Sequence, residues 1–151
     1  MQKIVVAVAV IEDEKLLVVK EADEKHYGKY NLPSGHVDQN ESIFKAAIRE
    51  VKEETGYEVV LKNILTIHNL VSNDKQVLVI IFKGERLRGE KRFDKKEILD
   101  VEWLSIKELE EKSVDDIRAI PGIKATMLHS TIEKIKSKKL YPLAIIEEYL
   151  N

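Results

Sequence analysis

Three glutamates gather within one short stretch of the sequence, at positions 50, 53 and 54. A helix over residues 42–55 would place them three and four residues apart, as neighbours on one side of the helix. Each like-charge pair at these spacings destabilises an isolated helix by roughly 0.2–0.5 kcal/mol. We therefore interpret the cluster as a candidate site for a divalent cation, and its oxygen ligands favour Mg²⁺, Mn²⁺ or Ca²⁺ over zinc.

An apolar stripe runs along the same predicted helix, and the glutamates overlap its margin. At about 100° per residue, five side chains form the stripe: Ile43, Phe44, Ala47, Ile48 and Val51. Glu50 projects between Ala46 and Ala47, where partial burial would increase the repulsion between the carboxylates. A bound cation would remove that penalty. The alternative is a water-exposed acidic face, which is the common explanation for an acidic triplet taken alone.

The glutamates belong to a longer pattern with fixed spacing. Gly35 is followed by five residues, then Glu41, then seven residues, then Arg-Glu-Val-Lys-Glu-Glu-Thr-Gly-Tyr over residues 49–57. This pattern resembles the Nudix box, G-x5-E-x7-R-E-U-x-E-E-x-G-U, in which U is a bulky aliphatic residue. Tyr57 is the one departure, and it concerns packing rather than chemistry. On this box the chain is similar to the Nudix hydrolases, a MutT-like family.

The resemblance implies both a fold and roles for individual residues. The fold would be α/β (α+β), with a mixed β-sheet sandwiched between α-helices. The metal ligands would be Glu50, Glu53 and Glu54. Arg49 would orient a carboxylate by a charge-assisted hydrogen bond, and Glu41 would support the metal site. Gly35 would permit close approach of the backbone, and its carbonyl could also bind the metal.

The implied reaction is attack of water on phosphorus, which cleaves a phosphoanhydride bond. Its substrate would be a nucleoside di- or triphosphate or a related metabolite linked to a nucleoside diphosphate, and its cofactor Mg²⁺ or Mn²⁺. Glu53 or Glu54 could act as the general base. Glu97 is a third candidate, because some relatives place a catalytic glutamate at the corresponding site. A solvated loop residue beside Lys95 and Lys96 is an equally good interpretation of Glu97.

Short motifs outside the box resemble one branch of the family, the NudJ-type phosphatases. They are Pro-Ser-Gly-His-Val at 33–37, Asn-Asp-Lys at 73–75 and Tyr-Pro-Leu at 141–143. That likeness implies release of phosphate from nucleoside tri- and diphosphates and from a pyrimidine pyrophosphate precursor of thiamine. Two other classes of function stay open: a Nudix-like domain that senses a nucleotide without cutting it, and a structural domain whose acidic helix is only solvated.

The elements that must position these residues can be outlined from their periodicity. Strands are predicted over residues 5–11, 16–20, 57–69, 76–82 and 100–104, the first two as a hairpin. Asn40 is the expected N-cap of the helix, and Gly56 suits its C-terminal end. Residues 30–35 have turn composition, and from residue 105 the pattern is helical with breaks at 121–122 and 142. We expect one domain of mixed helices and strands over residues 1–151.

Composition narrows the class of protein further. The 151 residues are 44% hydrophobic, as expected for a globular fold, and their net charge of −2 argues against wrapping by DNA or RNA. The absence of cysteine excludes disulfides and thiolate metal sites. The apolar run at residues 4–11 is too short to cross a membrane and lacks the flanks of a signal peptide. We expect a cytoplasmic protein, monomeric or homodimeric, that acts on a small phosphorylated partner.

Overall fold

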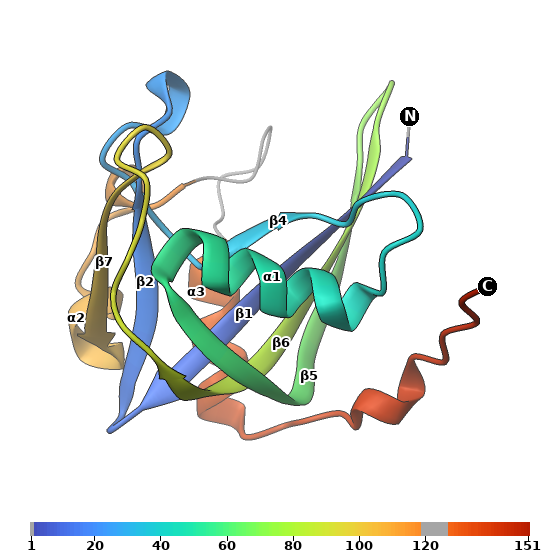
Figure 1. The fold of residues 1–151 in the computed structure, drawn as a ribbon. Coiled ribbons are helices and arrows are strands. Elements are labelled where there is room, and N and C mark those ends of the chain that lie inside the picture. Colours follow the sequence, from blue (N-terminus) through green and yellow to red (C-terminus); the bar gives the residue numbers. More distant parts are fainter. Residues whose placement is uncertain (1, 119–126) are drawn as a thin grey trace.

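The computed structural model describes residues 2–118 and 127–151 (Figure 1). Its first two strands, β1 (Gln2–Glu12) and β2 (Lys15–Glu21), form the hairpin that the apolar runs predicted. Asp13 and Glu14 make the turn, and both have left-handed backbone angles, with φ of 50° and 63°. A two-residue turn with this geometry matches the right-handed twist of the paired strands.

The remaining long strands build a mixed sheet around this hairpin. β6 (Gln76–Gly89) runs parallel to β1 and antiparallel to β5 (Tyr57–Val71), while β7 (Ile98–Ser105) pairs with β2. Within the described residues the sheet has seven strands. β6 extends well past its predicted end at residue 82, because the segment 83–89, although rich in charged residues, still pairs with β5.

Two short strands lie where the sequence predicted only a turn. β3 (Tyr30–Asn31) pairs with β2, and β4 (Ser34–His36) pairs with the first half of β1. These segments are too short to have a periodicity of their own, and their pairing depends on partners elsewhere in the chain. The turn interpretation of residues 30–35 was therefore wrong at both ends of the segment.

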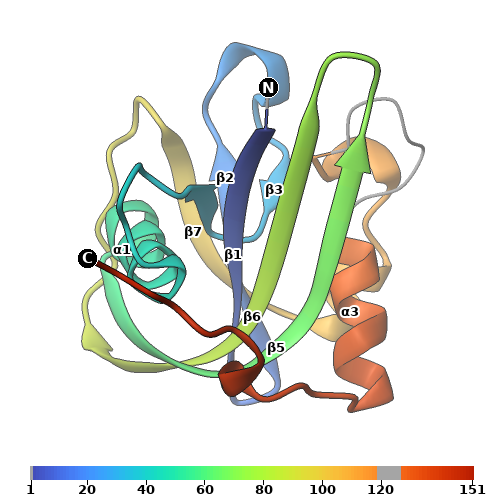
Figure 2. The ribbon, with the colours of Figure 1, turned by 90° about the vertical axis from the view of Figure 1, so that its right-hand side faces the viewer.

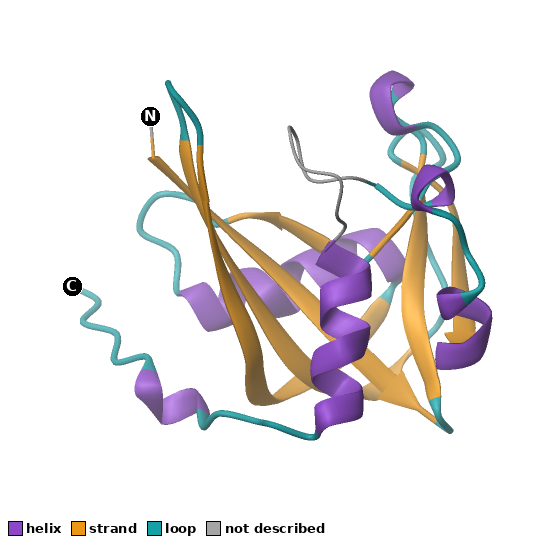
Figure 3. Ribbon diagram, turned by 180° about the vertical axis from the view of Figure 1, so that it is seen from behind, coloured by secondary structure: helices purple, strands orange, loops and turns teal. Residues whose placement is uncertain are grey.

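Helices cover both faces of the sheet, which confirms the predicted fold class. Alternation along β1 sends Val6, Val8 and Val10 to one face and Ala7 and Ala9 to the other. The first face packs against α1 (Ile43–Thr55), and the second against α2 (Ile106–Glu110) and α3 (Met127–Ser137). The view from behind shows α3 in front of the sheet and α1 beyond it (Figure 3).

The ends of α1 are fixed by two different residues. Its N-cap is Ser42, whose side chain accepts a hydrogen bond from the backbone of Lys45, so the expectation of Asn40 was wrong. Asn40 instead has a left-handed φ of 63° in the preceding turn. Gly56 ends the helix as predicted, with φ of 84°. A β-carbon on Gly56 would lie 2.2 Å from the Glu90 carbonyl oxygen, so only glycine fits there.

The C-terminal part of the chain is less helical than its pattern suggested. After α2 come the 3₁₀ turn η2 (Val114–Asp116), the helix α3 and a second turn η3 (Leu143–Ile145), and residues 146–151 have no regular structure. The predicted break at 121–122 lies outside the described residues. Figure 2 shows the chain after α3 crossing beneath β5 and β6 to the side of α1. No helix in the described part of the chain is long and apolar enough to span a membrane.

Candidate active site

The second half of α1 lies beside β4, and the contacts between them organise the glutamates. The backbone N–H of Ser34 donates a hydrogen bond to Oε1 of Glu54 over 2.8 Å. A β-carbon on Gly35 would lie only 2.1 Å from Cδ and 2.3–2.4 Å from both carboxylate oxygens of Glu50. Gly35 therefore leaves the space that the Glu50 carboxylate occupies, and any larger residue would displace it.

Arg49 holds one side of the acidic centre together. Its Nε and Nη2 donate to the two carboxylate oxygens of Glu41 over 2.7 and 2.9 Å. Its Nη1 donates to Glu50 over 2.8 Å and to Glu53 over 3.2 Å, and Nη2 also reaches the carbonyl oxygen of His36 at 3.1 Å. These bonds from Arg49 lower the pKa of Glu41. All three guanidinium nitrogens thus tie the loop before α1 to the second half of that helix.

Glu50 is balanced between opposing effects. Its side chain is only 14% exposed, and this burial raises the pKa of its carboxyl group. The hydrogen bond and charge of Arg49 oppose the shift, while the neighbouring Glu53 adds to it. In the described part of the chain, Arg49 is the one cationic partner of Glu50, and it only partly offsets the cost of burying the charge.

Glu54 lies deeper than Glu50, and its charged form is more strongly disfavoured. Burial is the main cause that raises the pKa of Glu54 to about 8. The hydrogen bond from Ser34 opposes the shift, and the charges of Glu21, Glu50 and Glu97 increase it. Among the described residues no cationic side chain forms an ion pair with Glu54. A cation bound here would supply the missing positive charge.

Glu53 and Glu97 lie at the exposed rim of the same centre. The Glu53 side chain is 56% exposed and contacts Arg49. Glu97 is exposed at the end of the loop before β7, and its carbonyl oxygen accepts a 3.0 Å hydrogen bond from Ala22. Since the charge of Glu97 contributes to the raised pKa of Glu54, the loop brings Glu97 close to the glutamates of α1. Both rim carboxylates can exchange protons with solvent.

The donor set fits a hard divalent cation, although the side chains are not yet gathered around one point. Among residues 2–118 and 127–151, no three carboxylate or imidazole groups form a complete ligand set. Arg49 and the Ser34 N–H hold these carboxylates instead. The donors are all oxygen, as Mg²⁺ and Mn²⁺ prefer, and the buried charge of Glu54 still lacks a cation.

Sequence reasoning missed three residues of this neighbourhood. Glu21, at the end of β2, is only 7% exposed and accepts hydrogen bonds from Asn31 and Arg118. One signal was present: continuing the alternation of Leu17 and Val19 by one step would have placed Glu21 on an inward face. Asn31 and Arg118 carried no such signal, because their roles depend on contacts across the fold.

Comparisons with known proteins place this geometry in a family. A family model described as the NUDIX domain matches residues 1–122. The solved structure of a NUDIX hydrolase from Nitrosomonas europaea superposes with a TM-score of 0.84 at 29% identity, covering 99% of this chain and 98% of that one.

Sequence relatives agree with the structural match. Phosphatase NudJ of Escherichia coli O1:K1 / APEC is 26% identical over 151 residues, 97% of this chain and 91% of that protein. Putative nudix hydrolase 1 of Caenorhabditis elegans is 30% identical over 130 residues, 82% of this chain. The chain spans only 35% of the length of that relative and 48% of the ADP-ribose pyrophosphatase of Methanocaldococcus jannaschii. The chain belongs to the NUDIX domain family, and its fold is that of the Nudix hydrolases.

Proposed function

We propose that this chain is a hydrolase that depends on Mg²⁺ or Mn²⁺ and cleaves a phosphoanhydride bond by attack of water at phosphorus. Its substrate would be a nucleoside di- or triphosphate or a metabolite linked to a nucleoside diphosphate. The observation that supports this most strongly is the partly buried Glu54 carboxylate, which lies near three other carboxylates and has no cationic partner among the described residues. The names of relatives agree with this class, since they include an ADP-ribose pyrophosphatase and a putative 8-oxo-dGTP diphosphatase of Bacillus subtilis.

Four residues are proposed to hold the cation: Glu50, Glu53, Glu54 and, through its carbonyl, Gly35. A bound Mg²⁺ or Mn²⁺ would neutralise phosphate oxygens and lower the pKa of the attacking water. Glu41 acts through Arg49, whose guanidinium it clamps by two hydrogen bonds. Arg49 in turn fixes the carboxylate of Glu50. These contacts hold the proposed metal-binding oxygens in place before the substrate binds. The site therefore needs little rearrangement during the reaction.

A carboxylate must also accept the proton of the attacking water. Glu53 and Glu97 are exposed and can pass the proton to solvent, whereas Glu54 is partly buried. The three candidates can be separated by comparing Glu53→Gln, Glu54→Gln and Glu97→Gln. Loss of the general base removes the acidic limb of the pH–rate profile of kcat, while loss of a metal ligand raises the Mg²⁺ concentration needed for half-maximal rate.

The decisive test of the proposal is a panel of phosphorylated compounds. The purified chain is incubated with nucleoside di- and triphosphates, ADP-ribose and organic pyrophosphates, with Mg²⁺, with Mn²⁺ or with EDTA. Phosphate and pyrophosphate are assayed separately, because 97% of the chain aligns with a relative named as a phosphatase. Metal-dependent turnover of at least one compound is expected. Nucleotide binding without turnover of any compound would contradict the proposal and favour a sensing domain.

The chain offers a matched control for the glutamate variants. Glu58 is the second residue of β5, just past α1, and is bonded to Lys52 and Arg88 at the surface. Glu58→Gln removes the same charge by the same chemistry, outside the proposed site. Its turnover should equal that of the unsubstituted chain.

A further inference from the structure

A partly buried ion pair between Glu21 and Arg118 lies beside the proposed site and has no part in the chemistry described so far. The Oε1 atom of Glu21 accepts a 3.1 Å hydrogen bond from Nη1 of Arg118 and a 3.2 Å bond from Nδ2 of Asn31. Glu21 is almost fully buried, whereas the Arg118 side chain is 40% exposed. Burying a carboxylate is costly unless it is paired, so Glu21 holds the guanidinium in one place.

Hydrogen bonds connect this pair to the acidic centre. The same Nδ2 atom of Asn31 that contacts Glu21 lies 3.4 Å from the hydroxyl oxygen of Ser34. The backbone N–H of Ser34 is the group that donates to Glu54 over 2.8 Å. Glu21 and Glu54 are therefore separated by only two intervening residues in a hydrogen-bonded path.

The segment that carries Arg118 is anchored on the same short strand. The Arg118 backbone N–H donates to the carbonyl oxygen of Tyr30 over 3.0 Å, and Ile117 forms a parallel bridge with Tyr30. Ile117 is 1% exposed, so the anchor is part of the core. The position of Arg118 is therefore set by the backbone as well as by Glu21.

Arg49 and Arg118 differ in how many of their side-chain N–H groups donate to protein oxygens. Arg49 donates through all three nitrogens to protein oxygens, which leaves little for a ligand. In the described part of the chain, the side chain of Arg118 makes one hydrogen bond, through Nη1 to Glu21. Its remaining donors lie on an exposed side chain. A guanidinium presents a planar fork of five N–H groups, and this fork matches two phosphate oxygens.

We propose that Arg118 binds a phosphate group of the substrate through the donors that Glu21 leaves free, and that Glu21 is its positioning residue. This assignment rests on the proposed function and names the part of the site that recognises the substrate's anionic end.

The test compares Arg118→Ala and Arg118→Lys with the unsubstituted chain. A lost pair of charge-assisted hydrogen bonds should raise KM roughly 10- to 100-fold in Arg118→Ala. The change in kcat should stay within about threefold, because the contact is made in both the ground and the transition state. Arg118→Lys keeps the charge without the fork and should fall between the two. Millimolar guanidinium ion should partly restore the KM of Arg118→Ala, which a purely structural role would not allow.

Glu21→Gln tests the positioning role. The amide oxygen can still accept both hydrogen bonds, but the charge that attracts Arg118 is gone. We expect a smaller rise in KM, of a fewfold, with kcat preserved. Arg88→Ala is the matched control, because Arg88 is a surface arginine bonded to Glu58, and its KM should not change. Circular dichroism and thermal melting confirm that each variant is folded.

Binding of inorganic pyrophosphate separates this inference from the proposed function. Calorimetry in Mg²⁺ requires no turnover, and Arg118→Ala should bind pyrophosphate at least tenfold more weakly than the unsubstituted chain. Failure of all substrates to turn over, with this difference intact, would reject the hydrolase and keep the anion site. Equal pyrophosphate affinity in both chains, or no binding by the unsubstituted chain, would overturn the assignment of Arg118.

Discussion

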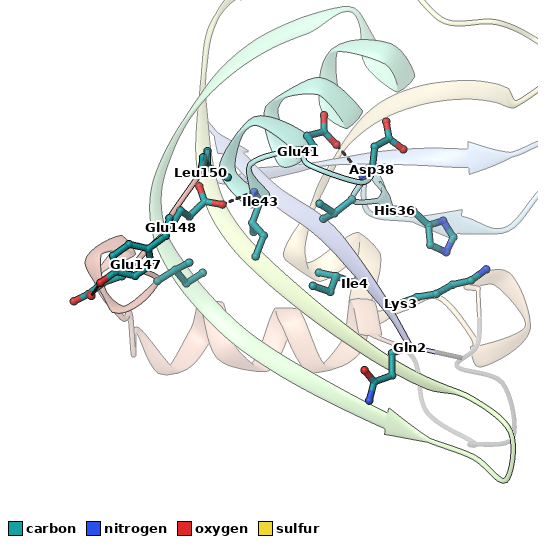
Figure 4. Close-up of a pocket in the computed structure, with 13 residues that line it drawn as sticks. Gln2, Lys3, Ile4, His36, Asp38, Glu41, Ile43, Glu147, Glu148 and Leu150 are labelled. Atoms are coloured by element: carbon teal, nitrogen blue, oxygen red, sulfur yellow. Dashed lines mark hydrogen bonds between the residues drawn. The ribbon is translucent and has the colours of Figure 1, made fainter.

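The two ends of α1 treat negative charge in opposite ways. At the N-terminus, the carboxylate of Glu148 accepts a hydrogen bond from the Ile43 backbone over 2.8 Å (Figure 4). It also accepts one from the Ser42 hydroxyl. An anion is favoured there by the unpaired N–H groups and by the helix dipole. Near the C-terminus, Glu50, Glu53 and Glu54 lie where that dipole disfavours anions. The carboxylate at the N-terminal end therefore stabilises the helix, whereas the carboxylates near the C-terminal end repel one another.

The difference indicates where this fold gives up stability for function. The carboxylate of Glu148, which holds the chain end against α1, accepts two hydrogen bonds. Glu54 is partly buried and has no cationic partner among the described residues, so its charge destabilises the protein until a cation binds. Functional sites commonly carry such unfavourable groups. Substitutions at the two ends should therefore separate activity from stability.

The largest effect is expected at the C-terminal end, in Glu54→Gln. The amide keeps the shape and can accept the Ser34 hydrogen bond but cannot neutralise a cation. Turnover should fall at least about 100-fold. Steady-state assays in saturating Mg²⁺ measure this, with Glu58→Gln as control. A rate within tenfold of the unsubstituted chain would show that Glu54 is not part of the reacting centre.

Gly35→Ala should come next, because the added β-carbon would collide with the Glu50 carboxylate. Displacing Glu50 should weaken Mg²⁺ binding roughly 10- to 100-fold, the usual cost of disturbing the support of a metal ligand. The measurement is the Mg²⁺ concentration at half-maximal rate. Gly28→Ala is the control: a β-carbon there meets nothing within 4 Å, although its φ of 78° also costs stability. Equal Mg²⁺ requirements in the two variants would contradict the steric argument.

Repulsion among these carboxylates should make the free energy of unfolding depend on pH when no metal is bound. The pKa of Glu54 is raised from 4.5 to about 8 by folding, so the native state binds more protons than the unfolded state between these values. Stability must then fall as pH rises through this window, by at most about 1.4 kcal/mol per pH unit. Urea unfolding in EDTA from pH 5 to pH 8 measures the slope.

Two comparisons sharpen this pH prediction. Glu54→Gln should show a shallower decline, and at pH 8 it should be more stable than the unsubstituted chain. Saturating Mg²⁺ should stabilise the unsubstituted chain more at pH 8 than at pH 5, because it favours the ionised carboxylate. Identical slopes in the two chains would mean that Glu54 ionises as easily in the folded state as in the unfolded state.

The smallest effect is expected at the N-terminal end. Glu148→Ala removes two hydrogen bonds from the first turn of α1 and should cost about 1 kcal/mol of unfolding free energy. Turnover should stay within about threefold. Glu147→Ala is the matched control, since the Glu147 carboxylate accepts a hydrogen bond from Tyr149 at the exposed surface and none from α1 among the described residues. A large loss of activity in Glu148→Ala at unchanged stability would contradict the contrast, because both ends of α1 would then serve activity.

Much of the site could be predicted because its chemistry is local in the sequence. The spacing of Glu50, Glu53 and Glu54 on one helix, and of Gly35 and Glu41 before it, is readable without a fold. Gly56 was predicted to end α1 for the same reason, since a helix end is decided within a few residues. Ser42 was missed as N-cap because several polar residues precede the helix, and the backbone of the turn decides among them.

By itself, the sequence determined the alternation of the strands, the helix with its carboxylates and the family to which they belong. Only the tertiary structure decided which distant groups meet them. Arg118 reaches Glu21 across 97 positions of the chain, and Glu148 reaches Ile43 across 105. Neither contact leaves a periodic or compositional trace, because each is a single polar pair whose geometry follows from the packing of the whole sheet. Glu54 likewise owes its raised pKa to burial and to neighbours from other segments.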